Sequence, residues 1–331
     1  MNSSIILPCT TINEHPFAEF IRILGKGKNG ARHLTQNEAE VAMSMILNNK
    51  VTDVQLGAFL MLLRYQEETA EELAGFANAT RQYTTTPDIK IDIDWPSYAG
   101  KKRHYPWYLL AAKLLAKQGI KVLMHGAGQH ASERLFTEQF LTALGINDCQ
   151  NWQEVKQSIN EENIAFIGLR QWLAKLQQLI DLRQILGVRS PIHSLARLLN
   201  PLRARCSLQS VFHPNYQAIH QQASLLLGDT SIIIKGEGGE TEVRPDNICI
   251  LLGTAQGQLW EEEWPALTNH RLLKPALLEP DYLLAVWQKK VNDEYADLAI
   301  PATIALALKG LGIARREAFL EANKIWELHI R

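Results

Sequence analysis

The densest run of basic residues in the sequence is Lys101-Lys102-Arg103-His104, and the aromatic residues Tyr98 and Trp107 lie close to it on either side. Lysine and arginine neutralise the phosphates of a nucleic acid, and an exposed ring can stack on an unpaired base. The segment therefore predicts a phosphate-binding loop with two candidate stacking rings. The alternative is a solvated loop beside aromatic side chains that pack into a core.

Two further groups of basic residues could extend the same surface, one in a glycine-rich segment near the N-terminus and one around Asn200-Pro201: Lys26, Lys28, Arg32, Arg197, Arg203 and Arg205. Arginine suits bidentate contacts to phosphate. For the first group the alternative is a glycine helix cap with solvated lysines. For the second group it is a set of salt bridges to acidic residues elsewhere in the chain.

The charge of the chain is unevenly distributed. The net charge is −1 and the pI is near 6.8, although residues 97–215 hold 15 Lys and Arg against 7 Asp and Glu. The remainder holds 19 Lys and Arg against 28 Asp and Glu. Such segregation favours one basic face that binds an anionic partner, provided that the residues cluster in space. A pI this low is unusual for a nucleic-acid-binding protein.

Composition favours a cytoplasmic location. No segment approaches the roughly 20 apolar residues of a membrane-spanning helix, and the N-terminus has no basic region of the kind that begins a signal peptide. The four cysteines, Cys9, Cys149, Cys206 and Cys249, include no Cys-x-x-Cys pair. Their scatter argues against a zinc site and for reduced thiols. The sequence therefore predicts a cytoplasmic protein without a membrane segment and without a bound metal.

The first 84 residues predict a bundle of helices. Apolar residues recur at helical spacing, as at Phe17, Ile21 and Leu24. Three capping boxes follow in series: Thr35 with Glu38, Thr52 with Gln55, and Thr69 with Glu72. In each box the hydroxyl accepts a hydrogen bond from the first turn, and the longer side chain reaches back to the cap.

From residue 85 the pattern changes to strands that alternate with helices. Ile89, Ile91 and Ile93 alternate with charged residues, which is typical of a strand. A helix is expected at about 107–118, and further strands at 121–124, 164–167 and 232–234. This order predicts an α/β fold with a mostly parallel central sheet. Ligands of such sheets gather at the carboxyl ends of the strands, where the loops at 96–104, 125–128 and 235–239 would lie.

Several motifs in this order resemble the glycosyltransferase family 3, or anthranilate phosphoribosyltransferase, group. They are Leu34-Thr35 with Glu38-Ala39, the segments 53–60 and 71–75, His125-Gly126, the segment 183–189, and Asn200-Pro201. The resemblance implies a small helical domain at 1–84, completed by helices in about 170–200. It also implies a large α/β domain at 85–331 and a homodimer formed through the helical domain.

The resemblance further indicates which functional residues have been replaced. The family's glycine-rich loop, which cradles a pyrophosphate, falls on 96–100, where proline lacks an N–H and Tyr98 is bulky. The segment that binds phosphate and magnesium falls on 106–109, and the segment with the phosphate-binding lysine and the substrate-contacting asparagine falls on 124–128. The acidic pair that holds magnesium falls on Glu240-Thr241, which keeps one of the two carboxylates. Arg183 matches the arginine that contacts the aromatic acid in the enzymes of the family. The resemblance thus implies no catalytic residue and a vestigial substrate cleft formed by Ser97, Gly100, His125, Gly126, Arg183 and Glu240.

Several of the replacements resemble the YbiB branch of the family, whose members bind nucleic acid. The matching segments are 25–32, 96–100, and Gly187-Val188-Arg189 with Ala196-Arg197. This resemblance implies that the protein binds DNA or RNA in a basic groove between the domains, largely without sequence specificity, without a cofactor and without transferase turnover. The expected phosphate contacts are Lys26, Lys28, Arg32, Lys101, Lys102, Arg103, Arg183, Arg189, Arg197, Arg203 and Arg205.

Two other functions remain open at this point. The first is an active transferase that uses magnesium and moves phosphoribose from phosphoribosyl pyrophosphate to anthranilate or a related aromatic compound. The second is a sensor of small anions that keeps the cleft but performs no chemistry. Loss of the phosphate-binding residues argues against the transferase, whereas Arg183 and Glu240 are the residues in its favour.

Overall fold

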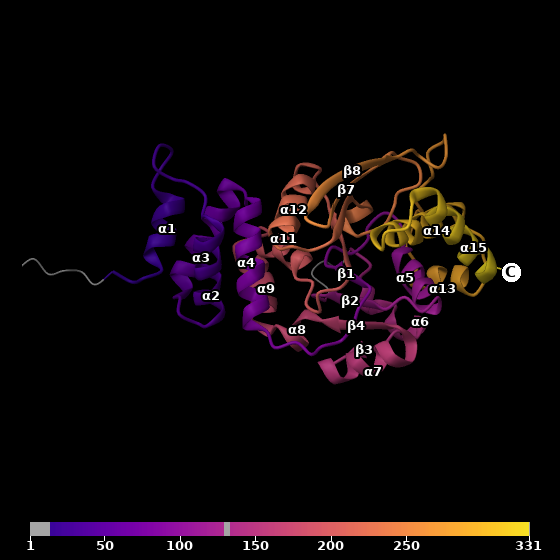
Figure 1. Cartoon of the computed structure of the whole chain (residues 1–331), viewed down its shortest axis with the longest axis horizontal. Helices are drawn as coiled ribbons and strands as arrows, with labels where there is room; N and C mark the ends of the chain where they lie inside the picture. Colours follow the sequence, from indigo (N-terminus) through magenta and orange to yellow (C-terminus); the bar gives the residue numbers. More distant parts are fainter. Residues whose placement is uncertain (1–13, 129–132, 331) are drawn as a thin grey trace, which may run out of the picture.

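Four helices form the N-terminal domain of the computed structural model, which describes residues 14–128 and 133–330 (Figure 1). They are α1 (Ala18–Gly25), α2 (Gln36–Leu47), α3 (Asp53–Gln66) and α4 (Ala70–Tyr83). The three predicted capping boxes are confirmed at the starts of α2, α3 and α4. At α2, for example, the Glu38 carboxylate accepts the backbone N–H of Thr35 at 2.9 Å. Side chains local in sequence therefore determine where these helices begin.

The core of the helical domain is built from two distant parts of the chain. Phe59 packs edge to face against Phe17 and Phe76, with ring centroids 5.1 Å and 6.2 Å apart. Buried residues between 169 and 199, such as Leu176 and Leu195, belong to the same apolar cluster. That segment contains α8 (Leu169–Trp172), α9 (Ala174–Asp181), α10 (Arg183–Leu186), α11 (Ile192–Leu195) and the 3₁₀ turn η2 (Ala196–Leu198).

The second domain is organised around an eight-stranded sheet with the order β3-β4-β2-β1-β5-β6-β7-β8. The strands are β1 (Ile93–Ser97), β2 (Val122–Gly126), β3 (Asp148–Cys149), β4 (Ile164–Gly168), β5 (Cys206–Val211), β6 (Ser231–Lys235), β7 (Cys249–Ala255) and β8 (Gln258–Trp264). Neighbours from β3 to β6 pair in parallel, and β7 and β8 are antiparallel. The predicted α/β fold with a mostly parallel sheet is confirmed.

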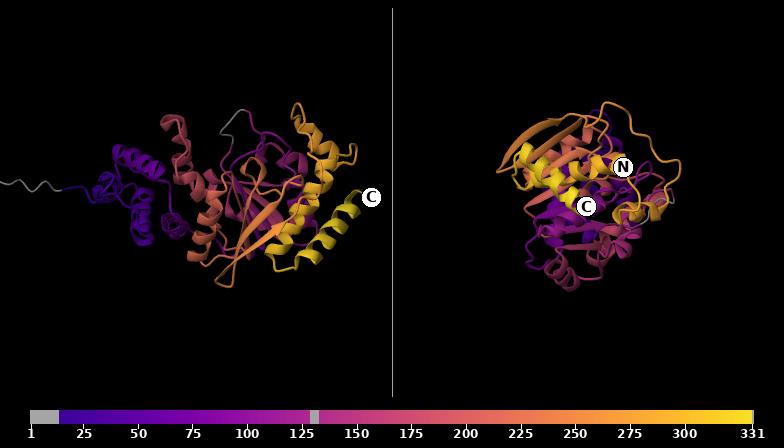
Figure 2. Two further views of the ribbon diagram at one scale, coloured as in Figure 1. Left: turned by 90° about the horizontal axis from the view of Figure 1, so that it is seen from above. Right: turned by 90° about the vertical axis from the view of Figure 1, so that its right-hand side faces the viewer.

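The remaining helices cover this sheet: α5 (Tyr108–Lys117), η1 (Thr137–Gln139), α6 (Leu141–Leu144), α7 (Trp152–Glu162), α12 (Asn215–Leu226), η3 (Glu237–Gly239), α13 (Pro280–Trp287), α14 (Glu294–Gly310) and α15 (Arg315–Ile330). Helix α14 is almost entirely buried and packs against α5, β5 and α15. The helical domain and helix α15 lie at opposite ends of the long axis (Figures 1 and 2).

Two details of the strand assignment were wrong. The alternating residues Ile89 and Ile91 form no strand, and β1 begins only at Ile93 and runs through Pro96. Every residue of β1 is buried because both faces of this central strand are covered, so alternation carried no information there. His125 and Gly126 belong to β2 instead of the loop that follows it.

Within the described residues, no helix combines the length and the apolar character that crossing a membrane requires. Cys149, Cys206 and Cys249 are buried free thiols, and burial raises the pKa of each to about 12. The fourth cysteine, Cys9, lies outside the described residues.

Candidate functional site

At the carboxyl end of β1, the chain binds one of its own carboxylates. The backbone N–H groups of Ala99 and Gly100 both donate to Oε1 of Glu240, at 2.7 Å and 2.6 Å. Consecutive N–H groups of this kind form an anion-binding concavity. Glu240 is buried, and burial raises the pKa of its carboxyl group. The loop that aligns with the family's pyrophosphate loop thus has these two donors engaged by an internal anion.

Beside this contact lies a buried lysine with two carboxylates. The Nζ atom of Lys101 is 2.7 Å from Glu237 and 2.7 Å from Glu242, and the Lys101 side chain is fully buried. Burial lowers the pKa of Lys101, but the two carboxylates outweigh burial and the pKa is raised. Burial also raises the pKa of Glu242 to about 7. The prediction that Lys101 contacts phosphate is therefore wrong, because its amine faces inward.

Side-chain hydrogen bonds fill the rest of the expected substrate cleft. The Ser97 hydroxyl lies 2.7 Å from the hydroxyl of Thr137 and 3.1 Å from that of Tyr108, and all three side chains are buried. Gly126 leaves no room for a larger residue, since a Cβ atom there would lie 2.7 Å from the carbonyl oxygen of Ser97. Ser97 and Gly126 serve packing here.

The two predicted stacking rings belong to the protein core. The hydroxyl of Tyr98 lies 2.7 Å from Nδ1 of His125, whose Nε2 lies 3.0 Å from Asp94. Tyr98 is 6% exposed and Trp107 is 1% exposed. The prediction that these two rings stack on bases is wrong, because neither presents a face to the outside. His125 is likewise a buried structural residue.

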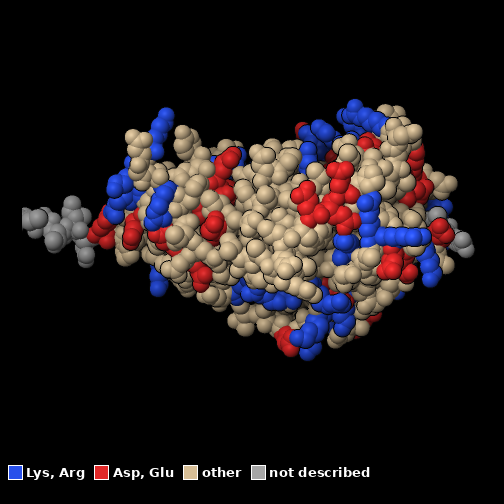
Figure 3. Space-filling model, turned by 45° about the horizontal axis from the view of Figure 1, so that its top comes forward, with Lys and Arg blue, Asp and Glu red and all other residues tan. Residues whose placement is uncertain are grey.

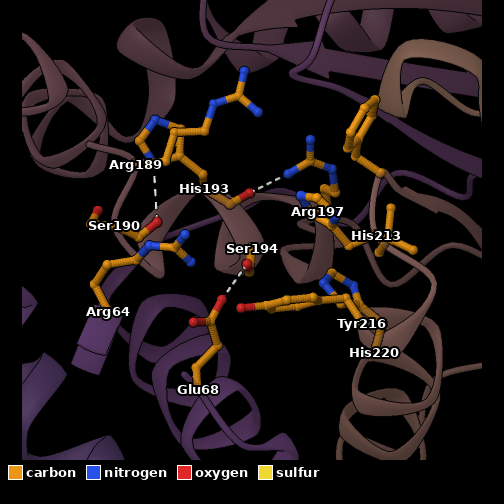
Figure 4. A pocket seen from close by; sticks show the side chains of 12 residues that line it. Arg64, Glu68, Arg189, Ser190, His193, Ser194, Arg197, His213, Tyr216 and His220 are labelled. Carbon is orange, nitrogen blue, oxygen red and sulfur yellow. Dashed lines mark hydrogen bonds between the residues drawn. The ribbon is translucent and has the colours of Figure 1, made fainter. Parts of the chain in front are cut away.

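A pocket between the two domains is lined by two of the predicted arginines, Arg189 and Arg197 (Figure 4). It is formed by the end of α3, the α3–α4 connection, the segment around α11, and the start of α12. Its lining includes Arg64, Arg189 and Arg197 together with His193, His213 and His220. Arg197 donates to the backbone carbonyl of His193. The pocket therefore carries a concentration of positive charge at the boundary of the domains.

Arg189 lies close enough to three other arginines, Arg197, Arg183 and Arg134, for their charges to act on it. The pKa of Arg189 is lowered to about 10, first by burial and then by the charges of Arg197, Arg183 and Arg134. Arg134 itself donates to the backbone carbonyls of residues 99, 100 and 238. Among the described residues, none of the five arginines 64, 134, 183, 189 and 197 forms a salt bridge with a carboxylate. We call these five residues the arginine cluster.

The other predicted basic residues do not join one groove. Arg203 pairs with Asp229 at 3.3 Å, and Arg205 pairs with Asp92 at 3.0 Å. Residue 205 directly precedes β5, and Cys206 pairs with Ile93 at the amino end of β1, so both arginines lie at the opposite edge of the sheet from Gly100. The prediction that they share a groove with residues 101–103 is wrong, and the salt-bridge alternative describes them.

Lys102 and Arg103 remain exposed at the carboxyl edge of the sheet. Lys102 forms a salt bridge with Glu133, and both residues line a cavity of about 490 Å³ with Arg134 and Lys274. By contrast, the loop with Lys26, Lys28 and Arg32 lies in the helical domain beyond α4, away from the sheet (Figure 1), and Arg32 pairs with Glu38 at 2.7 Å. On the face in Figure 3, basic and acidic residues are intermingled and no continuous basic band appears.

Sequence reasoning missed several residues of the pocket. Arg64 lies in a predicted helix where no motif points to a ligand. Arg134, which belongs to the arginine cluster but does not line the pocket, was missed as well. Phe212, which is 53% exposed, also lines the pocket. Phe212 directly follows β5, a strand that was not predicted from the sequence, and parallel strands present their ligands at that end.

The residues present do not fit a magnesium ion. Hard cations need several free oxygen ligands. Here Glu237 and Glu242 hold the Lys101 amine, and Glu240 holds two backbone N–H groups. In residues 14–128 and 133–330, no group of three or more His, Cys, Asp or Glu side chains is placed to bind a metal.

Comparison with known proteins agrees with the fold. The helical-bundle domain of a glycosyl transferase family matches residues 18–84, and the a/b domain of the same family matches residues 108–262. Anthranilate phosphoribosyltransferase of Gluconobacter oxydans (strain 621H) is 30% identical over 319 residues, which cover 95% of this chain and 84% of that protein. The uncharacterized protein YbiB of Escherichia coli (strain K12) is 29% identical over 235 residues, 69% of this chain and 73% of that protein.

A solved structure gives the same result. Anthranilate phosphoribosyltransferase from Saccharomyces cerevisiae, in complex with PRPP and Mg, has a TM-score of 0.75 to this chain at 17% identity, over 95% of this chain and 94% of that one. The two-domain arrangement, the sheet order and the similarity along nearly the whole sequence lead to one conclusion: the chain belongs to the glycosyl transferase family that includes the anthranilate phosphoribosyltransferases.

Proposed function

We propose that this chain is a cytoplasmic protein that binds DNA or RNA between its two domains, largely without sequence specificity, and does not transfer phosphoribose. The arginine cluster is the observation that carries the proposal. Burial and then the neighbouring arginine charges lower the pKa of Arg189, and within the described residues none of the five side chains forms a salt bridge with a carboxylate. Partly buried like charges that form no salt bridge favour an anionic ligand, and arginine is suited to phosphate.

The similarity to YbiB is consistent with this proposal, and so is the loss of free phosphate-loop donors. Lys102 and Arg103 would extend the binding surface from the cluster along the carboxyl edge of the sheet, since both line a cavity with Arg134. Non-specific binding follows from contacts to phosphates, which carry no sequence information. Lys26, Lys28 and Arg32 lie apart from this path, and Arg203 and Arg205 lie at the other edge.

The proposal predicts a strong dependence on salt. If the five arginines each neutralise one phosphate, affinity should fall on the order of 100- to 1,000-fold between 50 and 200 mM salt. Arg189→Ala should weaken binding to all sequences and reduce the log–log salt slope by about one. Fluorescence anisotropy of a labelled oligonucleotide measures both quantities. Arg205→Ala is the matched control, because Arg205 is exposed but lies at the opposite edge of the sheet.

Two results would count against the proposal. One is that wild-type protein shows no oligonucleotide binding at 50 mM salt. The other is that Arg189→Ala and Arg205→Ala have the same affinity and slope as the wild type, which would place the nucleic acid away from the arginine cluster. A small-anion sensor would instead bind oligonucleotides weakly and gain little affinity from a longer strand.

We also propose a homodimer through the helical domain. Val54, Met61 and Tyr65 lie along one face of α3, and Val54 and Tyr65 are 83% and 84% exposed. Apolar side chains aligned on one helix face favour association with a second copy. Light scattering should find a dimer at micromolar concentration and a monomer for Tyr65→Asp. Leu320→Asp, at an exposed apolar position on α15, should remain dimeric. A monomeric wild-type protein would contradict the proposal.

A further inference from the structure

The pocket that holds part of the arginine cluster has an acidic floor. Glu68, between α3 and α4, is 3% exposed, and its Oε1 accepts the hydroxyl of Ser194. Its Oε2 atom is buried and has no hydrogen-bond partner among the described residues, and the same holds for the hydroxyl of Ser190, which is 6% exposed. Buried polar atoms are normally hydrogen-bonded. The pocket therefore combines arginines with two buried polar groups that have no hydrogen-bond partner among the described residues, Oε2 of Glu68 and the hydroxyl of Ser190.

Two aromatic side chains, Phe212 and Tyr216, also line this pocket. Tyr216 of α12 points its hydroxyl toward Glu68 and Ser194 (Figure 4), and Phe212 lines the pocket while 53% exposed. The cavity measures about 150 Å³, a size that in an engineered protein cavity admits benzene. One flat ring therefore fits, and a base pair does not.

Building on the function proposed above, we propose that this pocket takes one unpaired nucleobase of a single strand. The phosphates of the strand would lie on Arg189 and Arg197, the base would stack on Phe212, and an N–H of the base would donate to Oε2 of Glu68. Every nucleobase has an N–H on its Watson–Crick edge, so this contact does not select one base. In a duplex that N–H is already paired. The partner is thus single-stranded nucleic acid.

The test compares strands that have equal charge. Labelled eight-nucleotide DNA strands carry either thymine throughout or abasic sugars throughout, and a duplex of the same length is the third probe. Wild-type protein should bind the thymine strand about tenfold or more tightly than the abasic strand, because stacking on an aromatic side chain contributes roughly 1–3 kcal/mol per base. The duplex should also bind more weakly than the thymine strand. A strand of N3-methylthymine, which lacks the N–H, should lose affinity as well.

Phe212→Ala should remove most of the difference between the thymine and abasic strands and leave the affinity for the abasic strand unchanged. Leu320→Ala, at an exposed apolar site on α15, should behave as the wild type. Equal, salt-dependent affinities for thymine and abasic strands would overturn the base pocket while the proposed function stands. Full affinity for the methylated strand would exclude the contact to Glu68. No binding to any of the probes would overturn the proposed function, and the base pocket with it.

Discussion

Lys101→Met should lower the free energy of unfolding by about 3–5 kcal/mol, because it leaves two buried carboxylates without their cation. In the wild type the amine lies 2.7 Å from both Glu237 and Glu242. Urea denaturation followed by circular dichroism measures the change. Buried carboxylates without a cation bind protons more tightly in the folded than in the unfolded chain. The stability of the variant should therefore fall as pH rises, and the loss should be smaller at pH 5 than at pH 8.

The neighbouring residue supplies the control. Lys102 also forms a salt bridge, with Glu133, but both side chains are exposed, so Lys102→Met should cost no more than about 1 kcal/mol. Changing Glu237 and Glu242 to Gln together with Lys101→Met should recover much of the lost stability, since no uncompensated charge then remains. Equal stabilities for the two single variants would show that Lys101 is not the buried cation described here.

The second expected result is that purified protein shows no phosphoribosyl transfer from phosphoribosyl pyrophosphate to anthranilate in the presence of magnesium. The N–H groups of Ala99 and Gly100 already bind Glu240, so a pyrophosphate would have to displace a buried carboxylate. Glu240 is the one carboxylate left at the family's magnesium-holding pair, and it is engaged by these N–H groups. The neighbouring carboxylates Glu237 and Glu242 hold the Lys101 amine and are not free for a metal ion. Enzymes typically turn over at about 1 to 1,000 per second, and a competent transferase should fall in that range.

The measurement is a fluorescence assay of anthranilate consumption with an excess of magnesium. An active anthranilate phosphoribosyltransferase assayed alongside provides the positive control. Turnover at or above about 1 per second would refute the proposed loss of activity. It would also mean that the Glu240 contact opens when substrate binds.

The sequence alone determined those features of the fold that depend on neighbouring residues. The capping boxes at Thr35, Thr52 and Thr69 satisfy the first turns of their own helices, so they could be predicted without knowledge of the packing. The alternation of strands and helices likewise indicated a mostly parallel sheet. The alternation of apolar and charged residues at Ile89 and Ile91 wrongly indicated a strand there. The actual strand, β1, is buried on both faces, and this burial depends on what packs against it.

Only the tertiary structure decided what the basic residues do. Lys101, Lys102 and Arg103 are adjacent in sequence, yet Lys101 points into the core toward carboxylates about 140 positions later, while the other two stay exposed. Arg197 and Arg205 are eight positions apart but lie at opposite edges of the sheet. Arg205 directly precedes β5 and lies at the amino edge, whereas Arg197 lines the pocket beside the carboxyl end of β5. A sequence gives the charge of a side chain but not the direction in which the side chain points. The burial of each side chain and the edge of the sheet that it faces are set by contacts between segments distant in the chain.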